Sequence, residues 1–127
     1  MDCTFTKAER LNSKLTIDKL FAGGNASTVA FPLRIVYMKV ENTDLPVSVL
    51  ISVPKKRFRH ATDRNRMKRL VREAYRTNKH ILWQAIKDKD YSLAVAFVCI
   101  TDILPTFYSV NKSIKKALTQ ISERLNK

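Results

Sequence analysis

Glycine, proline, cysteine and long apolar runs are all scarce in this sequence of 127 residues. Two glycines and four prolines leave no flexible linker, so we expect one domain over residues 1–127. The two cysteines, Cys3 and Cys99, do not have the spacing of a zinc site. Cys99 lies in an apolar run, so we expect it to be a small buried residue.

The longest apolar run, residues 93–100, is too short to cross a membrane. The first residues lack the apolar stretch of a signal peptide. We therefore expect a cytoplasmic protein without a membrane partner.

Acidic residues are also few. The 11 Asp plus Glu stand against 24 Lys plus Arg, which gives a formal net charge of +13. The acids are scattered, and the two histidines, His60 and His80, are far apart, whereas protein phosphodiesterases cluster such groups. No Gly-rich phosphate loop occurs either. We therefore expect no catalytic residue, no metal ligand set and no organic cofactor in the chain. The excess positive charge favours a nucleic acid partner over a merely soluble basic surface.

The apolar pattern predicts the order helix, three strands, helix, strand, helix. The adjacent Gly23 and Gly24 indicate the end of the first helix, which Asn12 or Ser13 can cap. The expected elements are a helix over 13–22, a short strand from 27 ahead of Pro32, strands over 33–40 and 47–53, a helix over 64–79 continuing to 87, a strand over 91–100 and a helix over 106–125. The strand over 91–100 is apolar on both faces and therefore central. This order predicts an α/β (α+β) sandwich, with helices packed on one mostly four-stranded sheet.

One segment, residues 55–76, concentrates the positive charge and holds only two acids, Asp63 and Glu73. On a helix starting at Arg64, one side is apolar, while cationic residues fall within an arc of roughly 40° to 140°. The apolar side comprises Met67, Leu70, Val71, Ala74 and Tyr75, and the cationic side Asn65, Lys68, Arg69, Arg72 and Arg76. Like-charged neighbours oppose this helix by about 1 kcal/mol in all. A row of phosphates outside it would offset that repulsion, and arginine suits bidentate phosphate contacts. A solvated basic face is the alternative interpretation.

The stretch from Arg64 to Arg76, Arg-Asn-Arg-Met-Lys-Arg-Leu-Val-Arg-Glu-Ala-Tyr-Arg, resembles the signature helix of the bacterial ribonuclease P protein subunit. The preceding Ile-Ser-Val-Pro-Lys-Lys at 51–56 is similar to the family's strand ending in Ser-Val-x-Lys-Lys. Arg10-Leu11 and Leu20-Phe21-x-x-Gly24 also fit, so the resemblance covers nearly the whole chain. It implies a fold like a ribosomal-protein domain, with a left-handed βαβ crossover around the signature helix that chain-connection rules alone would not predict.

The resemblance also implies a function. The chain would be the non-catalytic protein subunit of the ribonuclease P endoribonuclease, which removes the 5′ leader from precursor tRNA. The catalyst would be the ribonuclease P RNA, and the Mg²⁺ would be held mainly by that RNA. The implied partners are that RNA and precursor tRNA, with no protein partner required.

By position, the resemblance implies RNA contacts at two groups of residues. The RNA-binding group comprises Lys55, Lys56, Arg57, Arg59, Arg64, Asn65, Arg66, Lys68, Arg69, Arg72 and Arg76. The leader cleft comprises Ile17, Phe21, Phe31 and Arg34, where unpaired bases can stack on rings. For Phe21, core packing is an equal alternative. Ile17 and Arg34 stand where relatives place aromatic residues, which predicts a cleft that relies more on charge. The loop 57–63 is one residue longer than usual and lacks the usual glycine, although Thr62 or Asp63 can cap the following helix.

Two other classes of function stay open on the sequence alone. A ribosomal or general RNA-binding protein would bind any structured RNA equally well. A DNA-binding module would mix base-reading residues into the exposed helix face, and the nearly pure cationic stripe disfavours that reading.

Overall fold

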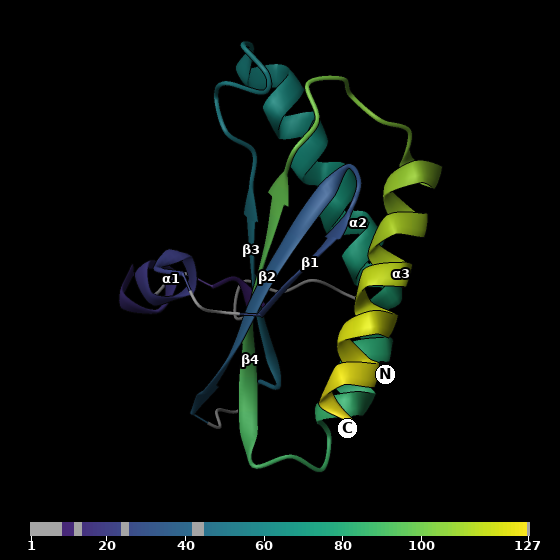
Figure 1. Ribbon diagram of the computed structural model, residues 1–127. Helices are drawn as coiled ribbons and strands as arrows, with labels where there is room; N and C mark the ends of the chain where they lie inside the picture. The colour runs from purple at the N-terminus through teal and green to yellow at the C-terminus, as the bar shows by residue number, and fades with distance from the viewer. Residues whose placement is uncertain (1–8, 12–13, 24–25, 42–44, 127) are drawn as a thin grey trace.

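A four-stranded sheet lies at the centre of the molecule, as the computed structural model shows (Figure 1). The structure describes residues 9–11, 14–23, 26–41 and 45–126. Along the chain lie α1 (Lys14–Phe21), β1 (Ala26–Ala30), β2 (Leu33–Glu41), β3 (Val47–Ser52), α2 (Ala61–Ile86), β4 (Tyr91–Cys99) and α3 (Phe107–Leu125). The predicted order and fold class are confirmed. Cys3 and the expected capping residues Asn12 and Ser13 lie outside the described residues.

The strands are arranged in the order β1-β2-β4-β3. β1 and β2 pair antiparallel, as do β2 and β4, whereas β3 and β4 pair parallel. β4 is therefore central, as its apolar sequence predicts, and Phe97 lies between Ile35 of β2 and Ile51 of β3. α2 connects the parallel pair β3 and β4. That this β3-α2-β4 crossover is left-handed stays a prediction.

The two faces of the sheet are covered unequally. Residues such as Ile35, Val49 and Phe97 are buried in the main core, which the sheet forms with α2 and α3. α1 lies on the opposite side (Figure 1), where its one buried residue, Leu20, packs against Val36 and Ala96. Because α1 has only eight residues, it covers only part of this face.

α2 is one continuous helix of 26 residues, and its predicted apolar side is confirmed. Met67, Val71, Ala74 and Tyr75 are fully buried, and Leu70 is partly buried against the same core. The 3.6-residue period that separates apolar from cationic positions in the sequence therefore corresponds to a real inside and outside of the helix.

The start of α2 differs from expectation. The helix begins at Ala61, its N-cap is His60, and no side chain caps it, so the expected capping by Thr62 or Asp63 was wrong. The preceding loop is fixed by other means. Phe58 is buried in the main core, and the Arg64 guanidinium donates to the carbonyl oxygens of Phe58 at 2.8 Å and Arg59 at 3.0 Å. These bonds and the buried ring hold the loop where a cap was expected.

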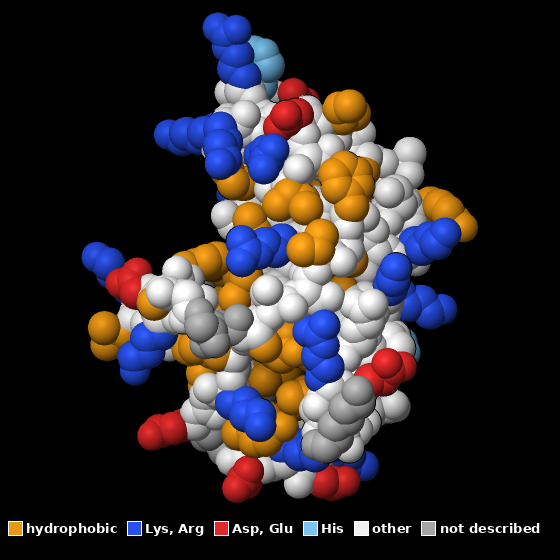
Figure 2. Space-filling model, viewed as in Figure 1, with side chains coloured by type: hydrophobic (Ala, Val, Ile, Leu, Met, Phe, Trp, Pro, Cys, Tyr) orange, Lys and Arg blue, Asp and Glu red, His pale blue; other side chains and the backbone are white. Residues whose placement is uncertain are grey.

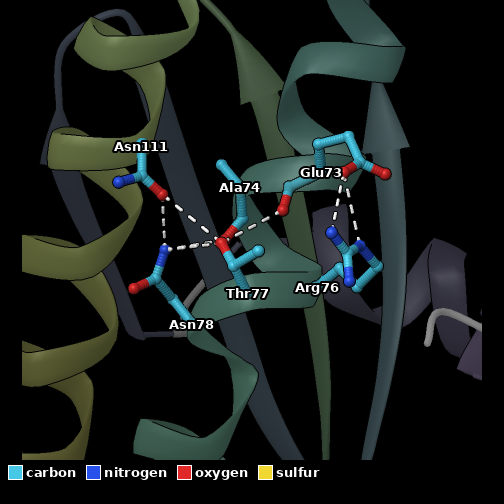
Figure 3. Close-up of polar contacts among 6 residues, drawn as sticks. All are labelled: Glu73, Ala74, Arg76, Thr77, Asn78 and Asn111. Carbon is cyan, nitrogen blue, oxygen red and sulfur yellow. Dashed lines mark hydrogen bonds and ion pairs between the residues drawn. The ribbon is translucent and has the colours of Figure 1, made fainter. Parts of the chain in front are cut away.

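α3 packs along α2, and a small polar network also joins the two helices (Figure 3). The buried side chain of Asn78 donates from Nδ2 to Asn111 Oδ1 at 2.7 Å and to the Ala74 carbonyl at 2.8 Å. Thr106 caps α3 by accepting from the Ser109 N–H at 3.2 Å. The predicted buried stripe of α3 is confirmed, with Leu125 only partly buried: Val110, Ile114, Ala117, Leu118, Ile121 and Leu125.

Candidate nucleic-acid interface

The outward side of α2 carries a dense row of basic side chains. Asn65, Arg66 and Arg69 are exposed, and Lys68 and Arg72 are partly exposed. Within the described part of the chain, none of these four cations has an ion pair with a carboxylate. Lys55 and Lys56 are exposed just after β3. The helix therefore presents positive charge that the described acids do not neutralise.

Three other arginines of the expected interface have partners within the protein. Arg76 pairs with Glu73 at 3.0 Å (Figure 3), and Arg57 pairs with Asp102 at 3.3 Å. Arg64 bonds the loop carbonyls already described. Surface ion pairs contribute only about 0–1 kcal/mol, so Arg57 and Arg76 can exchange these carboxylates for phosphate at little cost.

A groove of about 240 Å³ runs beside β3, next to the cationic row. Lys68 and Arg72 of α2 form one wall, and Arg10 and Leu11 form another part of the lining. Arg10 forms an isolated parallel bridge with Val49, and the Leu11 N–H donates to the Val49 carbonyl at 2.8 Å. Arg10 is not among the residues that the sequence predicts for the interface. Arg10 reaches this groove only by pairing with β3, which is distant in the sequence.

The segment that carries Arg10 is anchored by a buried ion pair. Lys79 Nζ lies 3.0 and 3.2 Å from the two carboxylate oxygens of Glu9. Both side chains are only 3% exposed. Lys79 Nζ also lies 4.7 Å from the centroid of the Trp83 ring, and Trp83 donates from Nε1 to the Tyr75 hydroxyl at 3.1 Å. The contact joins residues 70 positions apart, and no local sequence signal indicates it.

Three of the four expected cleft residues lie on α1 or on the face of the sheet next to it. Phe21 is 48% exposed, which contradicts the core-packing alternative for this residue. Ile17 is partly buried on the same helix, and Arg34 is exposed on β2, two residues from Val36 of the α1 face. Figure 2 shows hydrophobic side chains gathered beside α1, with Lys and Arg side chains around them.

The α1 face and the groove beside β3 meet at two residues, Leu11 and Leu50. Both pack against the cluster of Leu20, Val36 and Ala96, and both line the groove with Lys68 and Arg72. The two surfaces are therefore continuous through these residues.

Phe31 does not join this group. It lies in the turn between β1 and β2, is 68% exposed, and lines a second groove with residues of α3. The expected grouping of Phe31 with Ile17 and Phe21 is therefore not the one that the structure shows. The chain reverses at this turn, and the ring projects beside α3, a placement that strand periodicity cannot predict.

In the described part of the chain, no helix is long and apolar enough to cross a membrane. Nor do three or more His, Cys, Asp or Glu side chains there lie together as metal ligands.

The fold and the surface define a class: a small, basic α/β protein whose long cationic helix packs against one face of a four-stranded sheet. The family model for ribonuclease P matches residues 5–122. The ribonuclease P protein component of Porphyromonas gingivalis is 43% identical over 118 residues, which cover 92% of this chain and 85% of the relative. The corresponding protein of Chlorobaculum tepidum is 32% identical over 130 residues, covering 94% of this chain and 84% of the relative.

Two solved structures have the same fold. The ribonuclease P protein of Thermotoga maritima superimposes with a TM-score of 0.69 at 21% identity, covering 88% of this chain and 96% of that one. A structure of the Staphylococcus aureus protein gives 0.66 at 18% identity, covering 91% and 96%. The chain belongs to the ribonuclease P protein component family. Its role is accordingly in tRNA processing, as a protein component of ribonuclease P.

Proposed function

We propose that this chain is the non-catalytic, RNA-binding subunit of ribonuclease P. In this proposal it assists a catalytic RNA in the endonucleolytic removal of the 5′ leader from precursor tRNA. One observation carries the proposal: Arg66, Lys68, Arg69 and Arg72 form an outward row without carboxylate partners in the described part of the chain. Such a row opposes its own helix by like-charge repulsion, and phosphates on an RNA would relieve that repulsion.

The cationic side of α2 is the proposed contact with the ribonuclease P RNA. Arginine outnumbers lysine there, and its planar guanidinium can bind a phosphate through two parallel N–H bonds. The buried side of α2 holds the helix rigidly against the core, so the row keeps a fixed spacing. The proposed contact residues are Lys55, Lys56, Arg57, Arg59, Arg64, Asn65, Arg66, Lys68, Arg69, Arg72 and Arg76.

The face beside α1 is the proposed site for the leader. Phe21 offers a half-exposed ring on which an unpaired base can stack, a contact worth about 1–3 kcal/mol. Arg34 supplies a positive charge on the same face, where a phosphate of the strand can approach it. Ile17 completes the apolar wall from α1. This cleft combines one aromatic ring with charge, as the sequence predicts from Ile17 and Arg34.

Mg²⁺ is proposed to be held mainly by the RNA subunit. Among the described residues, no three or more His, Cys, Asp or Glu side chains lie together as metal ligands. The chain's own contribution is to bind and orient RNA through the two surfaces above. We further propose a cytoplasmic location, and no protein partner is needed for this role.

Reconstitution with a bacterial ribonuclease P RNA tests the proposal. We expect the chain to activate that RNA at low magnesium and to raise its affinity for leader-bearing precursor over mature tRNA. The chain alone should cleave nothing. Equal affinity for any structured RNA without activation would instead indicate a ribosomal or general RNA-binding protein. Equal binding of duplex DNA and structured RNA in a filter assay would favour a DNA-binding module.

A further inference from the structure

A second groove, of about 490 Å³, lies between the edge strand β1 and the N-terminal half of α3. Its volume falls within the roughly 300–1,000 Å³ typical of sites that hold small ligands. Two exposed rings line it: Phe31 from the β1–β2 turn and Tyr108 from α3, which are 68% and 75% exposed. Lys112 and Lys116 line it as well. On the side formed by α3, Figure 2 shows exposed hydrophobic side chains next to Lys or Arg side chains.

Hydrogen bonds between α3 and β1 with its turn hold the walls of this groove in place. Ser113 donates from Oγ to the Phe31 carbonyl at 2.6 Å, which fixes the turn that carries the ring. Further along, Thr28 donates from Oγ1 to Gln120 Oε1 at 2.8 Å, and Arg124 donates to the Ser27 carbonyl at 3.1 Å. The two rings therefore stand on a braced frame, and binding between them requires little reordering of the backbone.

The lining suits an unpaired nucleotide. Tyr108, Lys112 and Lys116 follow one another at intervals of four residues, so they project from one side of α3. Lys112 and Lys116 have no carboxylate partner within the described residues. Every base has a face that stacks on an aromatic ring, and lysine attracts the phosphate that joins it to the next base. Rings without the lysines would suit an apolar partner equally well, whereas the charge selects a polyanion.

The groove lies next to the proposed leader cleft. Val29, which lines the groove, is the cross-strand partner of Arg34 on the cleft face. Paired strands lie about 4.8 Å apart, so only the edge strand β1 separates the two surfaces. We propose that this groove holds an unpaired nucleotide of the 5′ leader, farther from the cleavage site than the nucleotides beside Phe21. This inference rests on the proposed function of the chain as the leader-binding subunit.

The test compares leaders lengthened one nucleotide at a time, on a non-cleavable precursor tRNA bound to the reconstituted holoenzyme. Fluorescence anisotropy gives the affinity. Tyr108→Ala should weaken binding of long leaders about 5- to 150-fold, the equivalent of one lost stacking contact. It should leave the shortest leaders unaffected, and Tyr108→Phe should retain full affinity because the ring remains.

The lysines are tested through salt. For long leaders, the doubly substituted Lys112→Gln, Lys116→Gln chain should reduce the slope of log affinity against log salt by about 0.7 for each lysine lost. Lys115→Gln is the matched control, because Lys115 is an exposed lysine of α3 that does not line the groove. Thermal unfolding of each variant checks that the exposed substitutions leave the fold intact.

Several results would overturn the inference. If Tyr108→Ala impairs assembly with the RNA subunit, or weakens short and long leaders equally, the groove serves that RNA and not the leader. If it changes the oligomeric state instead, the occupant is a second copy of the chain. If Tyr108→Ala has no effect while Phe21→Ala weakens leader binding, the groove inference fails and the proposed function stands. If neither variant matters and longer leaders add no affinity, the leader-binding function itself fails.

Discussion

Replacing Glu9 by Gln should destabilise this protein far more than an ordinary substitution near a chain end. The Glu9 carboxylate lies 3.0 and 3.2 Å from Lys79 Nζ, and both side chains are 3% exposed. Glutamine has nearly the same shape but removes the negative charge. The ammonium of Lys79 then stays buried without its carboxylate, while its contact with the Trp83 ring remains.

The magnitude follows from desolvation. Removing one partner of a buried ion pair costs about 3–5 kcal/mol, because the remaining charge has lost both water and its counter-charge. The total free energy of unfolding of a domain is about 5–15 kcal/mol. Glu9→Gln should therefore remove a large share of the stability. Replacing both residues by apolar ones, Glu9→Leu with Lys79→Met, should recover much of the loss, because no unpaired charge remains.

Urea unfolding followed by circular dichroism measures both variants. The midpoint should fall for Glu9→Gln while the m-value stays constant, which shows that stability and not compactness has changed. A loss below about 1 kcal/mol would refute the reasoning, since that is the contribution of a solvated surface pair. A double variant that is less stable than the single one would refute it too, because the pair would then contribute more than the avoidance of a lone charge.

Four further predictions concern single sites. Arg69→Ala should reduce the salt slope of RNA affinity by nearly one, as expected for one lost phosphate contact, without lowering the melting temperature. Phe21→Ala should weaken the binding of leader-bearing precursor about 5- to 150-fold, but not that of mature tRNA. Asn111→Ala should lower the free energy of unfolding in urea by about 1–3 kcal/mol, because the buried Asn78 amide loses an acceptor. Burial raises the pKa of the Tyr75 hydroxyl, so stability should be unaffected below the unfolded-state pKa of about 10 and should fall above it. Urea unfolding across that pH range, compared with Tyr75→Phe, measures the effect.

Each of these has a result that would contradict it. Unfolding caused by Arg69→Ala would mean that the faces of α2 are assigned wrongly. Equal weakening of precursor and mature tRNA by Phe21→Ala would move that ring away from the leader. An unchanged midpoint for Asn111→Ala would mean that water replaces the lost acceptor. If Tyr75→Phe loses the same stability at high pH, the loss arises from other ionisable groups and not from Tyr75.

The sequence predicts the parts of this fold that depend on periodicity. Met67, Val71 and Ala74 recur at helical spacing, and they are buried on one side of α2. The strand over 91–100 is apolar at nearly every position, and β4 is central in the sheet. In both cases the residue pattern of the element itself predicts which side is buried, without information from residues distant in the sequence.

Other features depend on contacts between distant segments and could not be predicted in this way. Glu9 and Lys79 are charged residues that would normally be assigned to the surface, and only their mutual contact allows burial. Phe58 enters the core from a loop, and α2 begins after it without a side-chain cap. Phe31 sits beside α3 because of the turn, so a resemblance by position grouped it with the wrong surface.

The bonds from α3 to β1 and its turn also bear on how this protein behaves at high concentration. The outer edge of a sheet offers unpaired backbone groups to any other chain, which is a common route to aggregation. Here Ser113 and Arg124 occupy the carbonyls of Phe31 and Ser27, and α3 itself lies along that strand. At the opposite edge, Leu11 takes the carbonyl of Val49. Both borders of the sheet are thus partly blocked against strand addition, which disfavours aggregation through the sheet edges.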